Sequence, residues 1–323
     1  MTSFGTEHLL GLALGLALVL YFVAGGADFG GGMWDLLASG PRKALQREAV
    51  SRALGPIWEA NHVWLILAVV VLFAGFPRAF QLITTQLHVP LTLFLIGVVF
   101  RGSAFVFHQR GWGRVFGWAS LVSPLFLGMC VAAISSGRIE EGYFSPWTTP
   151  FAIVIGLFAV AQCAFLAAVF LAFETRKDPE LSGDFEARAF LSGVAVGVLA
   201  FLALLLSRRG APMLFEGLTG SPLAMLMHVM TATMAVSALW FLRKRAFELA
   251  RFSAAVQVAL VLGGWMSSQY PFLVVPGLTL ENAAGHASAR TAIVWALLAG
   301  LPVLAPSLWL LFKVFKQERQ RQP

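Results

Sequence analysis

Residues 8–26 read HLLGLALGLALVLYFVAGG, and this stretch decides the fold class. It contains no Asp, Glu, Lys or Arg, and it lacks the two-residue alternation of a membrane β-barrel strand. About 20 such apolar residues are enough for a helix to cross the hydrocarbon core of a bilayer. The sequence therefore predicts an all-α membrane protein.

The composition of the whole chain points the same way. Of 323 residues, 58% are apolar and 12% are charged, and the mean hydropathy is +0.78. A soluble domain carries about 25% charged residues, so a soluble enzyme and a disordered chain are excluded. The net charge of +7 does not indicate a nucleic-acid partner, because the basic residues lie in short clusters between apolar runs. Cys130 and Cys163 both lie inside such runs, which excludes a disulfide framework.

Nine stretches of the chain have the length and apolar character of membrane spans. They divide into four, four and one, and a weak echo between EAVSRAL at 48–54 and FEARAFL at 185–191 suggests two related halves. We expect one integral membrane domain over 1–323, with halves 1–136 and 151–275 and a final helix at 291–312. The nine expected spans are 8–26, 56–76, 80–100, 116–136, 151–173, 189–207, 223–242, 252–275 and 291–312.

Lysine and arginine alternate between the two sides of the membrane under this assignment. One side carries 18 of the 23 basic residues, and the other side carries 5. The positive-inside rule then predicts a chain whose N-terminus is outside and whose C-terminus is in the cytoplasm. The segments on the basic side are 27–55, 101–115, 174–188, 243–251 and the C-terminal tail.

Ionisable residues within spans are expensive and usually functional. Asp28 and Asp35 lie in the glycine-rich stretch that we expect to end the first span on the cytoplasmic side. Glu59 and His62 are three residues apart at the start of the second span, so they share a helix face. An acid and an imidazole here could open a proton path, and stabilisation of a helix terminus by Glu59 explains the spacing equally well.

His88 and His228 lie at similar depth in the third and seventh expected spans. Two imidazoles from different helices could ligate a b-type haem. The interpretation we favour is that each histidine bonds to a neighbouring backbone or faces a cavity. We therefore expect this chain to bind no metal, with His88 and His228 kept as alternative haem ligands.

Five stretches of the sequence form recognisable motifs: GADFGGGMWDLL at 26–37, WEANHVWLI at 58–66, Phe100–Arg101, FETRKDPELSGDFEARA at 173–189 and SQYPFLVVPGLTLENAA at 268–284. Taken together, they closely resemble subunit II of the cytochrome bd-type quinol oxidases, including the cyanide-insensitive branch. They occur in the family's order and cover nearly the whole chain.

The resemblance implies a fold, a reaction and a partner. The family's fold is two four-helix bundles plus one peripheral helix, embedded in the bacterial inner membrane. Its subunit II pairs as a heterodimer with a subunit I that holds haems b and d and oxidises quinol, and the complex reduces O2 to water. The sequence leaves open which quinol is used, whether a structural quinone binds this chain, and whether small accessory subunits attach.

The resemblance also assigns roles to particular positions. Asp28 and Glu59 match family acids that are linked to proton uptake from the cytoplasm, and no catalytic residue is implied in this chain. His62 departs from the family pattern, so no role is transferred to it. The positions that match structural or interface motifs of the family are Trp58, Asn61 and Arg101.

Two other functions remain as alternatives. A secondary transporter would need broken helices and a substrate site near the midplane of the membrane, and only the end-of-span acids Asp28 and Glu59 could couple ions. A haem-ligating cytochrome b subunit would depend on His88 and His228. Pigment spectra of the isolated chain separate that second alternative from the haem-free subunit.

Overall fold

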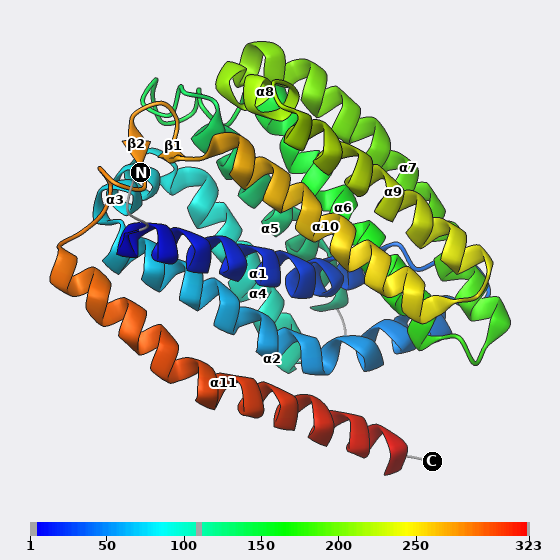
Figure 1. Ribbon diagram of the computed structural model, residues 1–323. Coiled ribbons are helices and arrows are strands. Elements are labelled where there is room, and N and C mark those ends of the chain that lie inside the picture. Colours follow the sequence, from blue (N-terminus) through cyan, green and yellow to red (C-terminus); the bar gives the residue numbers. More distant parts are fainter. Residues whose placement is uncertain (1–4, 108–111, 322–323) are drawn as a thin grey trace.

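The computed structural model describes residues 5–107 and 112–321. Within these ranges, the side chains of the following residues are not described: 54–60, 105–107, 112, 305, 308–309 and 311–321. The described chain is almost entirely helical (Figure 1). Its elements are α1 (Thr6–Leu36), α2 (Lys43–Gly75), α3 (Pro77–Gln86), α4 (His88–Phe107), α5 (Trp112–Ser135), α6 (Pro150–Glu174), α7 (Pro179–Gly210), α8 (Pro212–Thr219), α9 (Pro222–Arg243), α10 (Phe247–Gln269), β1 (Phe272–Val274), β2 (Leu278–Thr279) and α11 (Ala287–Arg321).

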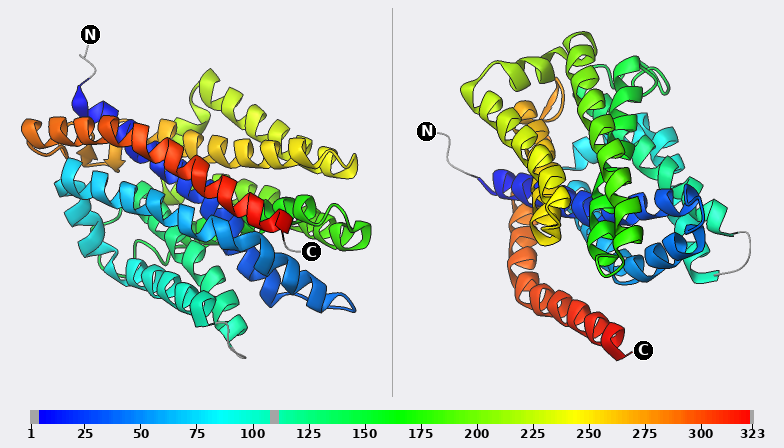
Figure 2. Two further views of the ribbon diagram at one scale, coloured as in Figure 1. Left: turned by 90° about the horizontal axis from the view of Figure 1, so that it is seen from below. Right: turned by 90° about the vertical axis from the view of Figure 1, so that its right-hand side faces the viewer.

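The long helices pack in neighbouring pairs. Helix α1 packs on α2, α4 on α5, α6 on α7 and α9 on α10, while α1 and α5 both contact α6 and so join the two halves. Helix α11 packs against α2 and α1, and its C-terminal part lies away from the other helices (Figure 2). The start of α1 and the end of α11 lie at opposite ends of the molecule (Figure 1).

The two halves share one local feature, a break between a long helix and a short helix that begins with proline. Helix α2 ends at Gly75 and is followed by the buried Phe76 and by Pro77, which begins the short helix α3. Helix α7 ends at Gly210 and is followed by the buried Ala211 and by Pro212, which begins the short helix α8. Proline is favoured in a first helical turn because its missing N–H needs no partner there. This second repeated feature supports the weak echo in the sequence.

The expected nine spans are reproduced in part. Among the described residues, seven helices are long and apolar enough to cross a membrane, and the bent pair Asn61–Gly75 with Pro77–Gln86 could add an eighth. The described part of α4, His88–Ala104, is apolar but too short to pass the same test. The all-helical membrane fold is therefore confirmed, whereas the arrangement of nine helices as two bundles plus one stays a prediction.

Two predicted span boundaries are wrong, and prolines explain both. The third expected span, 80–100, is broken at Leu87, and α4 starts at His88. Pro90 cannot donate the backbone bond that would continue α3 into α4. The eighth expected span, 252–275, ends as a helix at Gln269, because Pro271 favours an extended residue before it. The chain then forms the antiparallel pair β1–β2.

Candidate functional site

The first half of the molecule encloses a buried ion pair. Asp28 of α1 has an exposed fraction of 0%, and Arg101 of α4 has one of 2%. Arg101 Nη1 donates to Asp28 Oδ2 at 2.5 Å, and Nη2 donates both to Oδ1 and, at 3.0 Å, to the Asp28 carbonyl. Arg101 Nε donates to Ser120 Oγ of α5 at 2.9 Å. One guanidinium therefore ties three helices together.

Aromatic rings complete the surroundings of this guanidinium. Arg101 Cζ lies 4.7 Å from the centre of the Phe29 ring and 4.9 Å from that of Phe116. The negative face of an aromatic ring attracts a cation, and the attraction strengthens when water is excluded. The pair is thus compensated by hydrogen bonds and rings, which a buried charge requires if it is to be tolerated.

Glycines allow α1 to approach its neighbours near this pair. A Cβ atom on Gly30 would collide with the backbone carbonyl of Cys163 in α6. A Cβ atom on Gly25 would lie 2.5 Å from Nδ2 of Asn61 in α2. Small residues are used in this way where membrane helices pack closely. As expected, the glycine-rich stretch ends the helix, but α1 continues past the expected boundary at residue 26 to Leu36, so Asp28 lies about two turns before the helix end.

The remaining sequence-predicted residues of the first half are only partly described. Asn61 is 1% exposed, and its Oδ1 has no hydrogen-bond partner among the described residues. Trp58 and Glu59 belong to α2, which already begins at Lys43, so the expectation that Glu59 lies at a helix terminus is wrong. The side chains of both residues lie outside the described residues. The proton-path assignment of Asp28 and Glu59 therefore stays a prediction.

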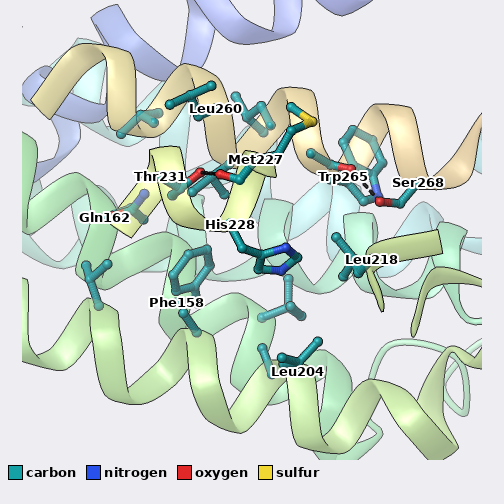
Figure 3. Close-up of a pocket in the computed structure, with 18 of the residues that line it drawn as sticks. Phe158, Gln162, Leu204, Leu218, Met227, His228, Thr231, Leu260, Trp265 and Ser268 are labelled. Carbon is teal, nitrogen blue, oxygen red and sulfur yellow. Dashed lines mark hydrogen bonds between the residues drawn. The ribbon is translucent and has the colours of Figure 1, made fainter. Parts of the chain in front are cut away.

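The second half encloses a cavity of about 450 Å3, lined mainly by apolar side chains of α6, α7, α9 and α10 (Figure 3). Two buried amides line it, Gln162 of α6 and Gln257 of α10, which are 1% and 2% exposed. Gln162 Nε2 donates to Gln257 Oε1 at 3.3 Å, and Gln162 Oε1 has no partner among the described residues. An unpaired buried acceptor is costly unless an occupant satisfies it.

The two histidines are not brought together as a ligand pair. His228 lines the cavity, and its Nδ1 lies 2.8 Å from the carbonyl oxygen of Ala224 (Figure 3). His88 Nδ1 lies 2.9 Å from the carbonyl oxygen of Thr85, and its ring meets the Tyr143 ring edge to face. Their helices pack in different pairs, α4 with α5 and α9 with α10. Within the described ranges, no group of three or more His, Cys, Asp or Glu side chains could hold a metal ion.

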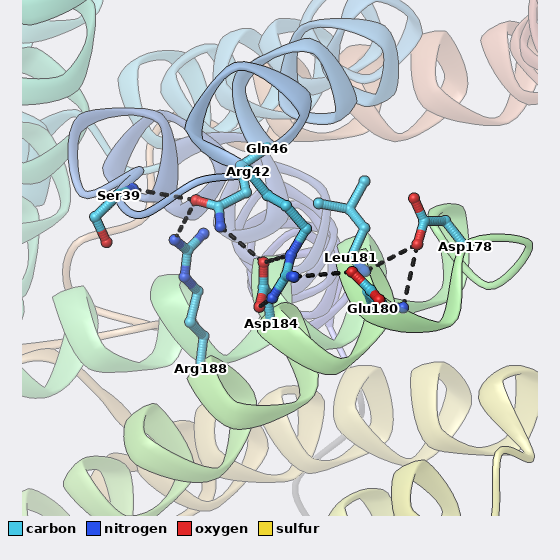
Figure 4. Close-up of polar contacts among 8 residues, drawn as sticks. All are labelled: Ser39, Arg42, Gln46, Asp178, Glu180, Leu181, Asp184 and Arg188. Atoms are coloured by element: carbon cyan, nitrogen blue, oxygen red, sulfur yellow. Dashed lines mark hydrogen bonds and ion pairs between the residues drawn. The ribbon is translucent and has the colours of Figure 1, made fainter.

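A second polar cluster joins the two halves near the starts of α2 and α7 (Figure 4). Arg42 donates to Asp184 at 2.6 and 2.9 Å and to Glu180 at 3.0 Å. Gln46 Nε2 donates to Asp184 at 2.8 Å, and Arg188 donates to Gln46 Oε1 at 2.7 Å. The hydrogen bond with Asp184 raises the pKa of Arg42 above its ordinary value. Acids therefore neutralise this basic site.

Sequence reasoning missed several of these residues. The sequence analysis considered the ionisable side chains of the spans as site residues, but not the neutral Gln162 and Gln257. A glutamine inside an apolar run could have indicated a polar site between helices. Sequence reasoning also placed Asp28 and Arg101 separately and did not predict their contact.

Comparison with known proteins identifies the family. The family model described as "Cytochrome bd terminal oxidase subunit II" matches residues 6–315. The chain belongs to this family. The resemblance stated from the five sequence motifs is thereby confirmed. As a family member, the chain is a subunit of a cytochrome bd terminal oxidase, an oxidoreductase complex of the respiratory chain, and an integral bacterial membrane protein.

Individual proteins of this family are similar to the chain in sequence or in structure. Cytochrome bd ubiquinol oxidase subunit 2 of Bacillus subtilis is 25% identical, covering 97% of this chain and 96% of that protein. Cytochrome bd-I ubiquinol oxidase subunit 2 of Escherichia coli K12 is 26% identical over 51% of this chain and 48% of its own length. A chain of the bd oxidase structure from Geobacillus thermodenitrificans has a TM-score of 0.82 at 24% identity, covering 96% of this chain and 98% of that chain. This last likeness supports the fold.

Proposed function

We propose that this chain is the haem-free membrane subunit of a quinol oxidase that reduces O2 to water. The observation that carries the proposal is the family match over residues 6–315. The partner is a subunit I that holds haems b and d and receives electrons from quinol. The present chain stabilises that partner in the membrane and contributes no catalytic residue.

The topology of the proposal follows from charge. The segments that carry 18 of the 23 basic residues face the cytoplasm, so the N-terminus is outside and the C-terminus is inside. The α1–α2, α6–α7 and α9–α10 turns lie at one end of the molecule, as this topology requires (Figure 1).

In this proposal Glu59 supports proton uptake, and Asp28, which the sequence also predicts on the proton path, has a positioning role instead. A proton carrier must exchange protons with water, but both carboxylate oxygens of Asp28 accept hydrogen bonds from Arg101, and the side chain has no exposed surface. Glu59 lies near the middle of α2, just before the apolar part of that helix. Glu59→Gln keeps the side-chain volume and removes titration. We expect slower oxygen uptake at unchanged haem content, and unchanged uptake would contradict the role of Glu59.

The cavity of the second half fits a structural quinone. It is within the usual 300–1,000 Å3 of small-molecule sites and is mostly apolar. The Gln257 amide can donate to a quinone carbonyl, and Gln162 Oε1 can accept from a quinol hydroxyl. A bound quinone would occupy the cavity and pack against its apolar side chains. Solvent extraction of the purified complex should yield quinone beyond that of the catalytic site, and Gln162→Leu should lower that amount.

Co-purification tests the proposed function as a whole. A tagged form of this chain should isolate a second, haem-bearing subunit from the native membrane, with b- and d-type absorption and quinol-dependent oxygen uptake. Recovery of the chain with no haem protein and no oxygen uptake would contradict the proposal.

A further inference from the structure

Six exposed basic residues gather at the turns that follow α6 and α9. We name them the basic turn cluster: Arg176, Lys177, Arg243, Lys244, Arg245 and Arg251. Both turns lie at the same end of the molecule (Figure 1). They immediately follow the membrane-crossing helices Pro150–Glu174 and Pro222–Arg243, so their charges lie at the depth of lipid headgroups.

Aromatic rings lie beside four of these six cations. Arg176 and Arg251 both lie over the Phe173 ring, with Cζ 4.1 and 4.2 Å from its centre. Arg243 lies 4.6 Å from the centre of the Phe190 ring. Lys244 Nζ is 6.0 Å from the centre of the Trp240 ring. A ring orients a cation but leaves its net positive charge in place.

In the part of the chain that the structure describes, no carboxylate forms an ion pair with the basic turn cluster. Across residues 5–107 and 112–321, the ion pairs within 4.0 Å include none of its six members. Arg42, near the start of α2, differs because Asp184 and Glu180 compensate it directly. The basic turn cluster therefore retains charge that an external anion can neutralise.

A surface pocket of about 300 Å3 lies within this cluster. Arg176, Arg245 and Phe173 line it together with the first turn of α10, residues 246–249. Ala246, the residue before α10, offers no side-chain cap for the free N–H groups of the helix start. Such a terminus favours an anion. Glu248 is the acid of the lining, so two arginines outweigh one carboxylate.

We propose that the basic turn cluster binds the headgroup phosphate of an anionic phospholipid. The phosphate accepts hydrogen bonds from Arg176 and Arg245 at the start of α10, and the acyl chains follow the exposed apolar surface of α9. Basic residues beside a membrane surface are attracted to anionic lipid. The inference depends on the membrane-crossing helices and not on oxidase activity, so it can fail while the proposed function holds.

The test uses the complex purified with a tagged form of this chain and placed in phosphatidylcholine nanodiscs with increasing phosphatidylglycerol. The variant Arg176→Gln/Arg245→Gln removes two charges from the pocket. We expect it to bind phosphatidylglycerol roughly tenfold more weakly than the parent, by native mass spectrometry, because it removes both side chains that donate to the phosphate in the pocket. Arg208→Gln/Arg209→Gln is the matched control, since these two exposed arginines lie at the far end of α7.

The control should retain the parent's affinity for phosphatidylglycerol. Equal affinity in the pocket variant and the parent would overturn the proposal. Equal loss in the variant and the control would also overturn it, because the attraction would then be a general charge effect. Inorganic phosphate added to the nanodiscs should leave lipid binding unchanged, and full competition by it would assign the pocket to a soluble anion instead.

Discussion

The two halves of the molecule share their helix order but differ in what lies between the helices. Between α1, α4 and α5, the space is filled by Arg101, its carboxylate partner Asp28 and two phenylalanine rings. Between α6, α7, α9 and α10, two buried glutamines adjoin a cavity of about 450 Å3. Similar helix packing therefore supports a closed half and a half with room for a ligand.

The difference has an energetic meaning. A buried ion pair contributes little net stability, but removal of one partner leaves a costly unpaired charge. A cavity contributes no packing energy until it is occupied. The first half should therefore be intolerant of single substitutions, and the second half should be tolerant.

The largest effect is expected from Arg101→Ala. It leaves the Asp28 carboxylate buried without its partner, which should cost about 3–5 kcal/mol. We expect loss of the assembled complex, measured as the yield of haem protein that co-purifies with this chain. Arg114→Ala, at an exposed position of α5, is the control and should retain the parent yield. Normal assembly of the Arg101 variant would contradict the claim that the first half depends on its buried ion pair.

A pair of glycine substitutions sharpens the comparison. Gly30→Ala should destabilise the protein by about 1–3 kcal/mol, because its Cβ would meet the Cys163 carbonyl. Gly197→Ala should be neutral or stabilising by up to about 1 kcal/mol, because no heavy atom lies within 4 Å of the added carbon. Thermal unfolding of the two variants measures the difference. Equal unfolding midpoints in the two variants would show that α1 is no more tightly packed at Gly30 than α7 is at Gly197.

Filling the cavity is expected to have a smaller effect on stability. Ala235 lines the cavity, so Ala235→Phe should shift the unfolding free energy by less than about 1.5 kcal/mol and should reduce extractable quinone. Ala238→Phe is the matched control, three residues along the same helix at an exposed fraction of 0%, and it should destabilise strongly. Similar losses in both variants would mean that the cavity has no free volume for a ring.

The smallest effect is expected from the histidines. His88→Ala/His228→Ala should leave the haem content of the assembled complex unchanged, because each imidazole bonds to its own helix or to the preceding turn. Reduced-minus-oxidised spectra measure this content. Loss of a b-type signal with normal assembly would favour haem ligation by this chain.

The sequence predicts the long helices well, because apolar length alone defines a membrane helix. It misplaces two span boundaries because Pro90 and Pro271 lie inside apolar runs that hydropathy treats as continuous. The local rule was available in both places: a proline interrupts the backbone bonds of a preceding helix.

The site could be predicted only in part. Asp28 and Arg101 are recognisable as costly residues, but their contact joins positions 73 residues apart and depends on helix packing. The cavity could not be predicted, because it is a space left between four helices rather than a residue pattern. His228, which lines the cavity, is recognisable in the sequence, and the buried amides Gln162 and Gln257 are a further local signal of that site.

The central claim is that the Asp28–Arg101 pair holds the first half together and does not carry protons. The double variant Asp28→Asn/Arg101→Gln tests it by removing both charges while keeping an amide that can hydrogen-bond at each position. The measurement is quinol-dependent oxygen uptake per haem in the purified complex. We predict that the double variant assembles better than either single variant and turns over at the parent rate. Slow turnover at normal assembly and haem content would contradict the claim and return Asp28 to the proton path.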